Sequence, residues 1–362
     1  MTDLDKARQI INEVDKELGR LFEKRMDAVR LVAKYKKEHG LPIENSSREE
    51  QVIERNVKNI SDEDYKPYYT SFLRNNMELA KSFQHRILDG MRVSFSGVKG
   101  AFADIACKRI FPDAKRIPYP DFKSAYRAVE NGECDCALLP IENSFNGDVG
   151  QVMDLAFFGK LYISGVYEAE IIQNLLAVKG SDISKIKTVI SHPQALGQCA
   201  SFIEKHGFNQ IEAENTAIAA KEVSESDRCD IAAIGSEDAA ERYGLSVLQS
   251  HINQSGSNTT RFAVFSLSQK NPEPSDEHFI LLFTVKNVAG SLGNAISVIG
   301  EYGFNLLSLK SRPTKDLIWN YYFYAEGEGN IASENGQKML EELSKCCSDL
   351  KVIGSFEKEF KI

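Results

Sequence analysis

Cysteine and histidine are scarce in this sequence, and those present lack the spacing of a metal site. Seven cysteines and six histidines are scattered over 362 residues. One residue separates Cys134 from Cys136, and Cys346 is adjacent to Cys347, so neither pair matches a zinc or thioredoxin-type motif. We therefore expect no metal, and we interpret the thiols as reduced groups of a cytoplasmic protein.

Long apolar runs and an excess of positive charge are also absent. No stretch approaches the length of a membrane span, and the N-terminus from Met1 to Lys6 is polar with no apolar core behind it. The formal net charge of -8 argues against a general affinity for nucleic acid. The composition, with 42% hydrophobic and 27% charged residues, is that of a globular protein, and the length fits two or three domains.

The chain has three regions with different sequence patterns. Residues 1–90 contain little glycine and have the periodicity of helices, whereas residues 91–270 alternate short β-rich runs with helical runs, as in parallel α/β folds. A polar linker with two prolines spans residues 271–276. Residues 277–362 show a strand–helix–strand–strand–helix–strand series, which predicts an α+β ferredoxin-like domain. We therefore predict a multidomain protein.

The helical region contains apolar stripes that are interrupted by polar residues. Apolar residues recur at steps of three and four from Leu4 to Tyr35, which predicts one long helix ending near Gly40. A second helix is expected to begin at Ser46 with a capping box, and a third carries an apolar stripe up to Ile87. The polar residues on or beside these stripes are Arg8, Arg25, Lys36, Asn45, Arg48, Glu49 and Gln84.

Four of these residues are cations, which suits a ligand with two carboxylates. Taken singly, each has a structural explanation, because a polar seam residue often fixes helix register and Glu49 also fits a cap. The combination resembles the all-helical chorismate mutase module of bifunctional aromatic-pathway enzymes, over residues 4–88. Asn45 stands where that family has Asp, and Ala80 stands where it has Ser.

The resemblance implies that this region rearranges chorismate to prephenate without proton transfer. Arginines would clamp the two carboxylates, Lys36 and Gln84 would donate to the ether oxygen, and Glu49 would hold the substrate hydroxyl. Arg8 and Arg25 are 17 residues apart, so on one straight helix they lie roughly 25 Å from each other. A site that uses both needs a second chain, and we therefore expect a homodimer or a higher homo-oligomer.

In the central region, polar residues repeatedly follow a predicted strand. Examples are Pro140–Ser144, Ser191–Gln194 and Gly235–Ser236, and ligands bind at such strand ends in open α/β sheets. The Gly97-x-x-Gly100 turn is too short for a phosphate loop, and no nucleotide fingerprint occurs, so we expect no cofactor.

These segments, together with the triplet Thr260-Arg261-Phe262, resemble prephenate dehydratase over residues 92–268. The resemblance implies a periplasmic-binding-protein-like fold with the site between two subdomains. Prephenate loses its ring hydroxyl and ring carboxylate together, so the leaving hydroxyl must be protonated or hydrogen-bonded. We assign Thr260 as the hydrogen-bond donor and a protonated Glu142 as a candidate proton source. The substrate would be bound by Asn143, Ser144, Gln194 and Arg261. His192 is interpreted as structural.

The C-terminal region resembles the ACT regulatory domain that accompanies prephenate dehydratases. We expect strands at Phe279–Lys286, up to Leu309, and at Ile318–Tyr324. The resemblance implies that L-phenylalanine binds between paired domains, at Gly290, Leu292, Asn305, Ser311 and Arg312. Lys310 stands where the family has Glu, and the alternative is a dimerisation domain without ligand.

The leading hypothesis is therefore a bifunctional enzyme that converts chorismate through prephenate to phenylpyruvate, with L-phenylalanine as effector. One alternative is a monofunctional dehydratase whose helical region only dimerises, and the changes at Asn45 and Ala80 motivate it. The other alternative is a non-catalytic protein that binds an amino acid or aromatic acid in a cleft.

Overall fold

The computed structural model describes residues 2–254, 258–314 and 320–362, and the chain divides into two compact units, Met1–Arg92 and Val93–Ile362. In the part of the chain that is described, no helix has the length and apolar character needed to cross a membrane.

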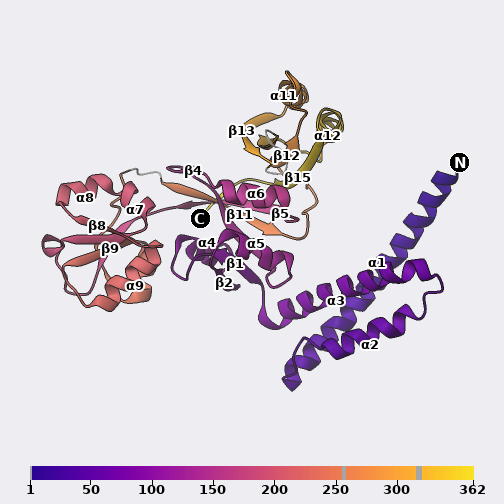
Figure 1. Ribbon diagram of the computed structural model, residues 1–362, viewed down its shortest axis with the longest axis horizontal. Helices are drawn as coiled ribbons and strands as arrows, with labels where there is room; N and C mark the ends of the chain where they lie inside the picture. The colour runs from indigo at the N-terminus through magenta and orange to yellow at the C-terminus, as the bar shows by residue number, and fades with distance from the viewer. Residues whose placement is uncertain (1, 255–257, 315–319) are drawn as a thin grey trace. The chain divides into compact units, whose positions relative to one another are not determined.

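The first unit consists of helices, as predicted from the apolar periodicity. Their bounds are α1 (Asp3–His39), α2 (Ser46–Val57), the 3-10 turn η1 (Glu63–Tyr65) and α3 (Lys66–Asp89). Helix α1 is followed by its C-cap Gly40, whose φ of 61° is in the left-handed region that glycine tolerates. In Figure 1 the N-terminal turns of α1 extend beyond α2 and α3.

The cap of α2 differs from the prediction. Asn45 is the N-cap, and its side chain accepts a hydrogen bond from the Arg48 amide at 3.0 Å. The predicted capping box between Ser46 and Glu49 is therefore wrong by one residue. Asparagine is at least as good an N-cap as serine, so Asn45 takes the cap position and the Glu49 side chain is left for other contacts.

The predicted apolar seam of α1 remains uncovered in a single chain. Its residues Leu4, Ile11, Val14, Leu18 and Leu21 have exposed fractions between 43% and 58%. Within the unit, α1 packs against α3, and α2 packs against α3. An exposed heptad seam of this length is typical of a helix that pairs with another helix.

The second unit begins with a sheet of order β5-β11-β3-β1-β2, in which β1 and β3 are parallel and β11 is antiparallel to both of its neighbours. Helices α4, α5 and α6 belong to this lobe, and α5 and α6 pack on β3. The elements are β1 (Arg92–Ser96), α4 (Phe102–Ile110), β2 (Lys115–Tyr119), α5 (Phe122–Glu130), β3 (Cys136–Asn143), β4 (Gly147–Asp148), α6 (Gly150–Phe158), β5 (Tyr162–Glu170) and β11 (Thr259–Ser266).

A second lobe is built on a separate sheet of order β10-β6-β9-β7-β8, with its own apolar cores. The chain enters it after β5 and leaves it before β11, so two segments connect the lobes, which confirms the predicted two-lobed α/β arrangement. Its elements are β6 (Asn174–Ala177), η2 (Ile183–Lys185), β7 (Thr188–Ser191), α7 (Pro193–Gln198), α8 (Ala200–His206), β8 (Asn209–Glu212), α9 (Thr216–Ser226), β9 (Ile231–Gly235), α10 (Glu237–Tyr243) and β10 (Ser246–Gln249).

The C-terminal segment has the predicted order of strands and helices, with an antiparallel sheet of order β13-β14-β12-β15. The elements are β12 (His278–Thr284), α11 (Ser291–Glu301), β13 (Asn305–Pro313), β14 (Tyr321–Glu328), α12 (Glu334–Cys346), β15 (Asp349–Phe356) and β16 (Phe360–Lys361). Residues 318 and 319 of the predicted third strand lie outside the described residues, and the strand is observed from Tyr321.

The sequence did not predict that this sheet continues into the first lobe. Gly354 of β15 pairs with Ile163 of β5, and β16 then pairs with β5 further along. A Cβ atom at Gly354 would lie 3.0 Å from the Ile163 carbonyl oxygen, so glycine permits the close approach. The boundary predicted between residues 270 and 277 thus lies within one compact unit.

Candidate active sites in the two units

In the helical unit, Arg25 is a partly buried cation without a carboxylate partner among the described residues. Its guanidinium donates to the carbonyl oxygen of Asn76 on α3 at 3.1 Å, and burial lowers its pKa. A desolvated guanidinium in this state favours an anionic ligand. Arg25, which was predicted to bind a carboxylate, thus lies on the face of α1 toward α3.

Glu49 and Lys36 also lie toward the interior of the unit, but each has a protein partner. Glu49 forms an ion pair with Lys81 of α3 at 3.3 Å, and Lys36 donates to the carbonyl oxygen of Ile43 at 2.6 Å. Lys81, which the sequence analysis did not identify, lies three residues before Gln84, so the two share one helix face.

Gln84 is buried, with 6% of its surface exposed, and its amide nitrogen donates to the Ala80 carbonyl at 3.3 Å. Its side-chain oxygen is buried without a partner. A buried unpaired polar atom is costly, and a donor that reached this oxygen would remove the cost. In this orientation the unpaired atom is the side-chain oxygen, which can only accept a hydrogen bond. The predicted donor role of Gln84 therefore requires its side-chain amide to flip, so that the nitrogen takes the place of the oxygen.

The remaining predicted residues of this site are not brought together in one chain. Arg8 lies on the exposed first turns of α1, and Asn45 and Arg48 are exposed at the start of α2. The Asn45 side chain is already used as the cap.

The second unit contains a cleft of about 820 Å³ lined by both lobes. The predicted residues Asn143, Gln194 and Thr260 line it, together with Gln173 and Gln198, which the sequence analysis did not identify. His192 also lines the cleft, and its ring nitrogen accepts a hydrogen bond from the Gln194 amide as the cap of α7. Apolar groups of Ala101 and Ala103 form part of the wall.

Hydrogen bonds fix which group Asn143 presents to Thr260. The side-chain oxygen of Asn143 accepts from the backbone amides of Phe145 and Asn146, each at 3.0 Å, and backbone amides can only donate. The amide nitrogen therefore faces Thr260 and donates to its Oγ1 at 2.9 Å. Because Oγ1 accepts this bond, the hydroxyl hydrogen of Thr260 is available to another acceptor.

Further buried side-chain amides continue from Asn143, and the direction of each hydrogen bond is set by its neighbour. Asn143 donates to the side-chain oxygen of Asn258 at 3.1 Å, and Asn258 donates to that of Gln198 at 2.9 Å. Gln173 donates to the same oxygen of Gln198 at 3.2 Å, which leaves its own side-chain oxygen buried and unpaired at the cleft. Asn258 lies two residues before Thr260 in the sequence, but Gln173 and Gln198 are far from it along the chain, so the sequence gave no signal for these contacts.

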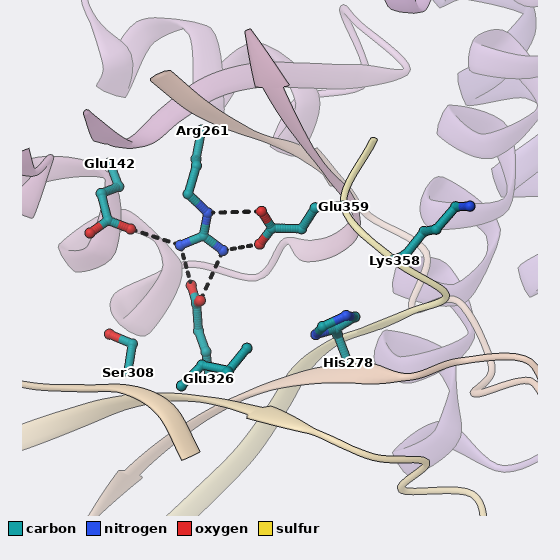
Figure 2. A pocket seen from close by; sticks show the side chains of 8 residues that line it. Glu142, Arg261, His278, Ser308, Glu326, Lys358 and Glu359 are labelled. Atoms are coloured by element: carbon teal, nitrogen blue, oxygen red, sulfur yellow. Dashed lines mark hydrogen bonds and ion pairs between the residues drawn. The ribbon is translucent and has the colours of Figure 1, made fainter. Parts of the chain in front are cut away.

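Glu142 and Arg261 do not line the cleft, and their predicted roles are corrected. Successive residues of a strand face opposite sides of the sheet, so Thr260 and Arg261 cannot both face the substrate, and the same holds for Asn143 and Glu142. Figure 2 shows the Arg261 guanidinium surrounded by the carboxylates of Glu142, Glu326 and Glu359. Arg261, Glu142, Glu326 and Glu359 line a separate hollow of about 500 Å³.

The predicted protonation of Glu142 is also wrong. Burial raises the pKa of its carboxyl group, but the hydrogen bond from Arg261 and the charges of Lys310 and Arg261 outweigh burial and lower the pKa below its usual value. Glu142 therefore remains an ionised partner of Arg261, at 2.7 Å, and of Lys310, at 3.3 Å. It is not a proton donor at neutral pH.

Ser144 is exposed at the end of β3 and is not among the residues that line the cleft. Its hydroxyl oxygen accepts a hydrogen bond from the Thr259 amide at 3.0 Å, and its own amide donates to the Thr259 carbonyl at 2.9 Å. These bonds tie the ends of β3 and β11 together, which is a structural contribution rather than a contact with substrate.

The predicted phenylalanine-binding residues differ in their surroundings. Gly290 has a φ of 87°, so a residue with a side chain would be strained there, and Leu292 is partly buried beside it. Asn305 donates to Glu328 at 2.8 Å, and Ser311 is exposed.

Arg312, which was predicted to bind the ligand, forms an ion pair within the chain. Its guanidinium binds both carboxylate oxygens of Asp154 on α6, at 2.7 and 3.0 Å, and Asp154 also accepts a bond from Tyr322 at 2.7 Å. Nε and one terminal nitrogen of the Arg312 guanidinium are therefore used by Asp154. Arg312 therefore joins the C-terminal sheet to the first lobe.

Comparisons with known proteins agree with this division of the chain. The family model of chorismate mutase type II matches residues 7–85, and that of prephenate dehydratase matches residues 93–270. A bifunctional chorismate mutase/prephenate dehydratase from Aquifex aeolicus is 31% identical over 366 residues, covering 99% of each chain.

Two solved structures resemble the second unit. The prephenate dehydratase from Arthrobacter aurescens in complex with L-Phe has a TM-score of 0.69 and 27% identity, covering 74% of this chain and 90% of that one. GqqA, described as a novel type of quorum quenching acylase, has a TM-score of 0.68 and 29% identity, covering 73% of this chain and 97% of that one. Because these two proteins of similar fold are described with different activities, the fold alone does not decide the chemistry.

Proposed function

The chain belongs to the family of bifunctional chorismate mutase/prephenate dehydratases, and we propose that its helical unit rearranges chorismate while the cleft around Thr260 converts prephenate to phenylpyruvate. The assignment of the dehydratase to the cleft rests on the direction of the hydrogen bond between Asn143 and Thr260. The Oγ1 of Thr260 accepts from Asn143, so its hydrogen is free to be donated into the cleft.

The dehydratase step requires a hydrogen-bond donor at the hydroxyl that leaves the ring. The bond between the ring and its carboxylate breaks, its electrons complete the aromatic ring, carbon dioxide is released, and the hydroxyl oxygen departs with the electrons of the carbon–oxygen bond. Thr260 donates to that oxygen as negative charge develops on it, and the oxygen then takes up a proton to become water. Gln194, at the cleft wall, would bind the substrate.

The mutase step requires only that the substrate be held in its folded conformer with its two carboxylates bound. Arg25 is the internal cation for one carboxylate. We propose that Arg8 comes from a second copy of the chain, because the exposed seam of α1 fits a partner helix and because roughly 25 Å separate the two arginines along one helix. Lys36, Arg48, Glu49 and Gln84 complete the proposed site.

Separate assays with chorismate and with prephenate test this function. The bifunctional proposal expects both acids to be consumed and phenylpyruvate to form from either. Turnover of prephenate without chorismate would leave only the dehydratase, with a helical unit that serves dimerisation. Failure to turn over either acid would favour a binding protein and overturn the proposal.

We further propose that residues 277–362 form an ACT regulatory domain that binds L-phenylalanine and thereby inhibits the dehydratase. The strand order, the left-handed Gly290 and the similar L-Phe complex from Arthrobacter aurescens support this. Lys310 does not oppose the ligand ammonium group, because its charge is paired with Glu142 and Asp148.

Addition of L-phenylalanine should release or absorb heat in calorimetry and should lower prephenate turnover at the same concentrations. Inhibition requires that the ligand bind one arrangement of the protein more tightly than another. L-leucine serves as the control for a general amino-acid effect. If millimolar L-phenylalanine gives neither heat nor inhibition, the C-terminal domain has only a structural role.

A further inference from the structure

The side chains of β3 and β11 form two neighbouring cross-strand pairs that face opposite sides of the sheet. Thr260 is opposite Asn143 in the ladder, and Arg261 is opposite Glu142. On the cleft side, Asn143 donates to Thr260 at 2.9 Å, and on the rear side, Arg261 donates to Glu142 at 2.7 Å. The rear pair is therefore one residue away from the pair that we assign to catalysis.

The ladder is irregular at this place. The register between β11 and β3 shifts between Arg261 and Phe262, so backbone pairing alone defines the alignment less firmly there. A cross-strand ion pair next to the bulge holds the alignment through side chains. The rear pair thus helps to keep Asn143 within hydrogen-bond distance of Thr260.

The C-terminal domain supplies most of the remaining contacts to Arg261. Glu326 of β14, with 5% of its surface exposed, accepts from both terminal nitrogens at 3.3 and 2.9 Å. Glu359, in the tail between β15 and β16, accepts from Nε at 3.2 Å and also from a terminal nitrogen. Figure 2 shows these carboxylates converging on one guanidinium from different elements.

The charges in this cluster depend on one another. Lys310 of β13 neutralises part of the acidic excess by pairing with Glu142 and Asp148, and Tyr324 donates to Glu326 at 2.6 Å. Burial alone would lower the pKa of Arg261, but the surrounding carboxylates raise it. Removal of Arg261 would leave these carboxylates without their shared cation, so Arg261 connects the C-terminal domain to the catalytic strands.

We propose that Arg261 is a positioning residue for the dehydratase, which holds β11 and β3 from behind and makes the geometry of Thr260 depend on Glu326 and Glu359 of the C-terminal domain. This inference rests on the proposed dehydratase site at Thr260. It replaces the role of substrate binding that the sequence suggested for Arg261.

The test compares Arg261→Met, Arg261→Lys and Glu359→Gln with the unchanged protein. We expect Arg261→Met to lower dehydratase kcat about tenfold or more while KM changes by less than about threefold, because misplaced groups slow chemistry more than binding. Arg261→Lys should recover part of the loss, because it keeps the charge, and Glu359→Gln should give a smaller loss than Arg261→Met. Mutase activity, which resides in the other unit, normalises the rates to the amount of chain, and the exchange measurement below reports the state of the unit that carries Arg261.

Lys270→Met is the matched control, because it removes another partly buried cation with two carboxylate partners, Glu273 and Asp276, away from this ladder. It should leave dehydratase kcat unchanged. Hydrogen–deuterium exchange provides a readout that does not depend on activity, and Arg261→Met should increase exchange in residues 259–266 relative to Lys270→Met.

Two kinetic results would overturn the inference. A rise in KM with unchanged kcat in Arg261→Met would mean that Arg261 contacts substrate. Increased exchange with unchanged kcat would mean that it contributes only to folding. Unchanged exchange in residues 259–266 would show that Arg261 does not stabilise β11. If the unchanged protein does not turn over prephenate, the proposed function fails, while the exchange experiment still decides whether Arg261 holds β11.

Discussion

Replacing Asn143 by aspartate lowers prephenate turnover about a hundredfold or more, which is the usual effect of losing one hydrogen bond to a developing negative charge. The substitution exchanges an amide nitrogen for an oxygen of similar size. A carboxylate cannot donate to Thr260, so the Thr260 hydroxyl donates to the new carboxylate instead and its hydrogen is no longer available in the cleft. Initial rates with prephenate, normalised to mutase activity, measure the effect.

A matched control separates this polarity effect from the added charge. Asn209→Asp adds the same charge at an exposed position of β8 in the other lobe and should leave the dehydratase unchanged. Turnover of the Asn143→Asp protein within about threefold of normal would contradict the assignment of Thr260 as a donor.

Mixing two inactive mutase variants restores activity if the mutase site is built from two chains. Arg8→Ala and Arg25→Ala each remove one proposed carboxylate clamp and should lower mutase activity about a hundredfold or more when alone. In a symmetric dimer, random exchange makes half of the dimers mixed, and one of the two sites in each mixed dimer keeps both arginines. Mutase activity should therefore recover to about one quarter of the normal value.

Co-refolding the two variants from denaturant, followed by an initial-rate assay with chorismate, measures the recovery. Each variant refolded alone controls for residual activity, and the dehydratase rate controls for the yield of folded protein. Mixed dimers that form but remain inactive would show that Arg8 and Arg25 do not serve one shared site.

Local patterns predicted the helices and the order of the strands well, because apolar periodicity and the residues that begin or end a helix depend only on neighbouring positions. Helix α1 ends just before Gly40 as expected, and the C-terminal series of strands and helices is observed in the predicted order. The cap of α2 was misplaced by one residue because Asn45 competes with Ser46 for the same position.

The predicted roles of Arg261 and Glu142 were wrong because neighbouring residues of a motif were all expected to face the substrate. Thr260 and Arg261 are adjacent in the sequence, but alternation along β11 sends them to opposite faces. This correction was within reach of the sequence, since the segment was recognisable as β-rich. The partners of Arg261 were not, because Glu326 and Glu359 lie far along the chain and meet it only through the continuous sheet.

Product analysis after supplying chorismate to the Thr260→Val protein tests the central claim most directly. Valine keeps the shape of threonine and removes its hydroxyl, while the helical unit is untouched. The account predicts that chorismate is consumed at the normal rate and that prephenate accumulates in its place, whereas the unchanged protein accumulates phenylpyruvate. Formation of phenylpyruvate by Thr260→Val at a rate near that of the unchanged protein would contradict the account.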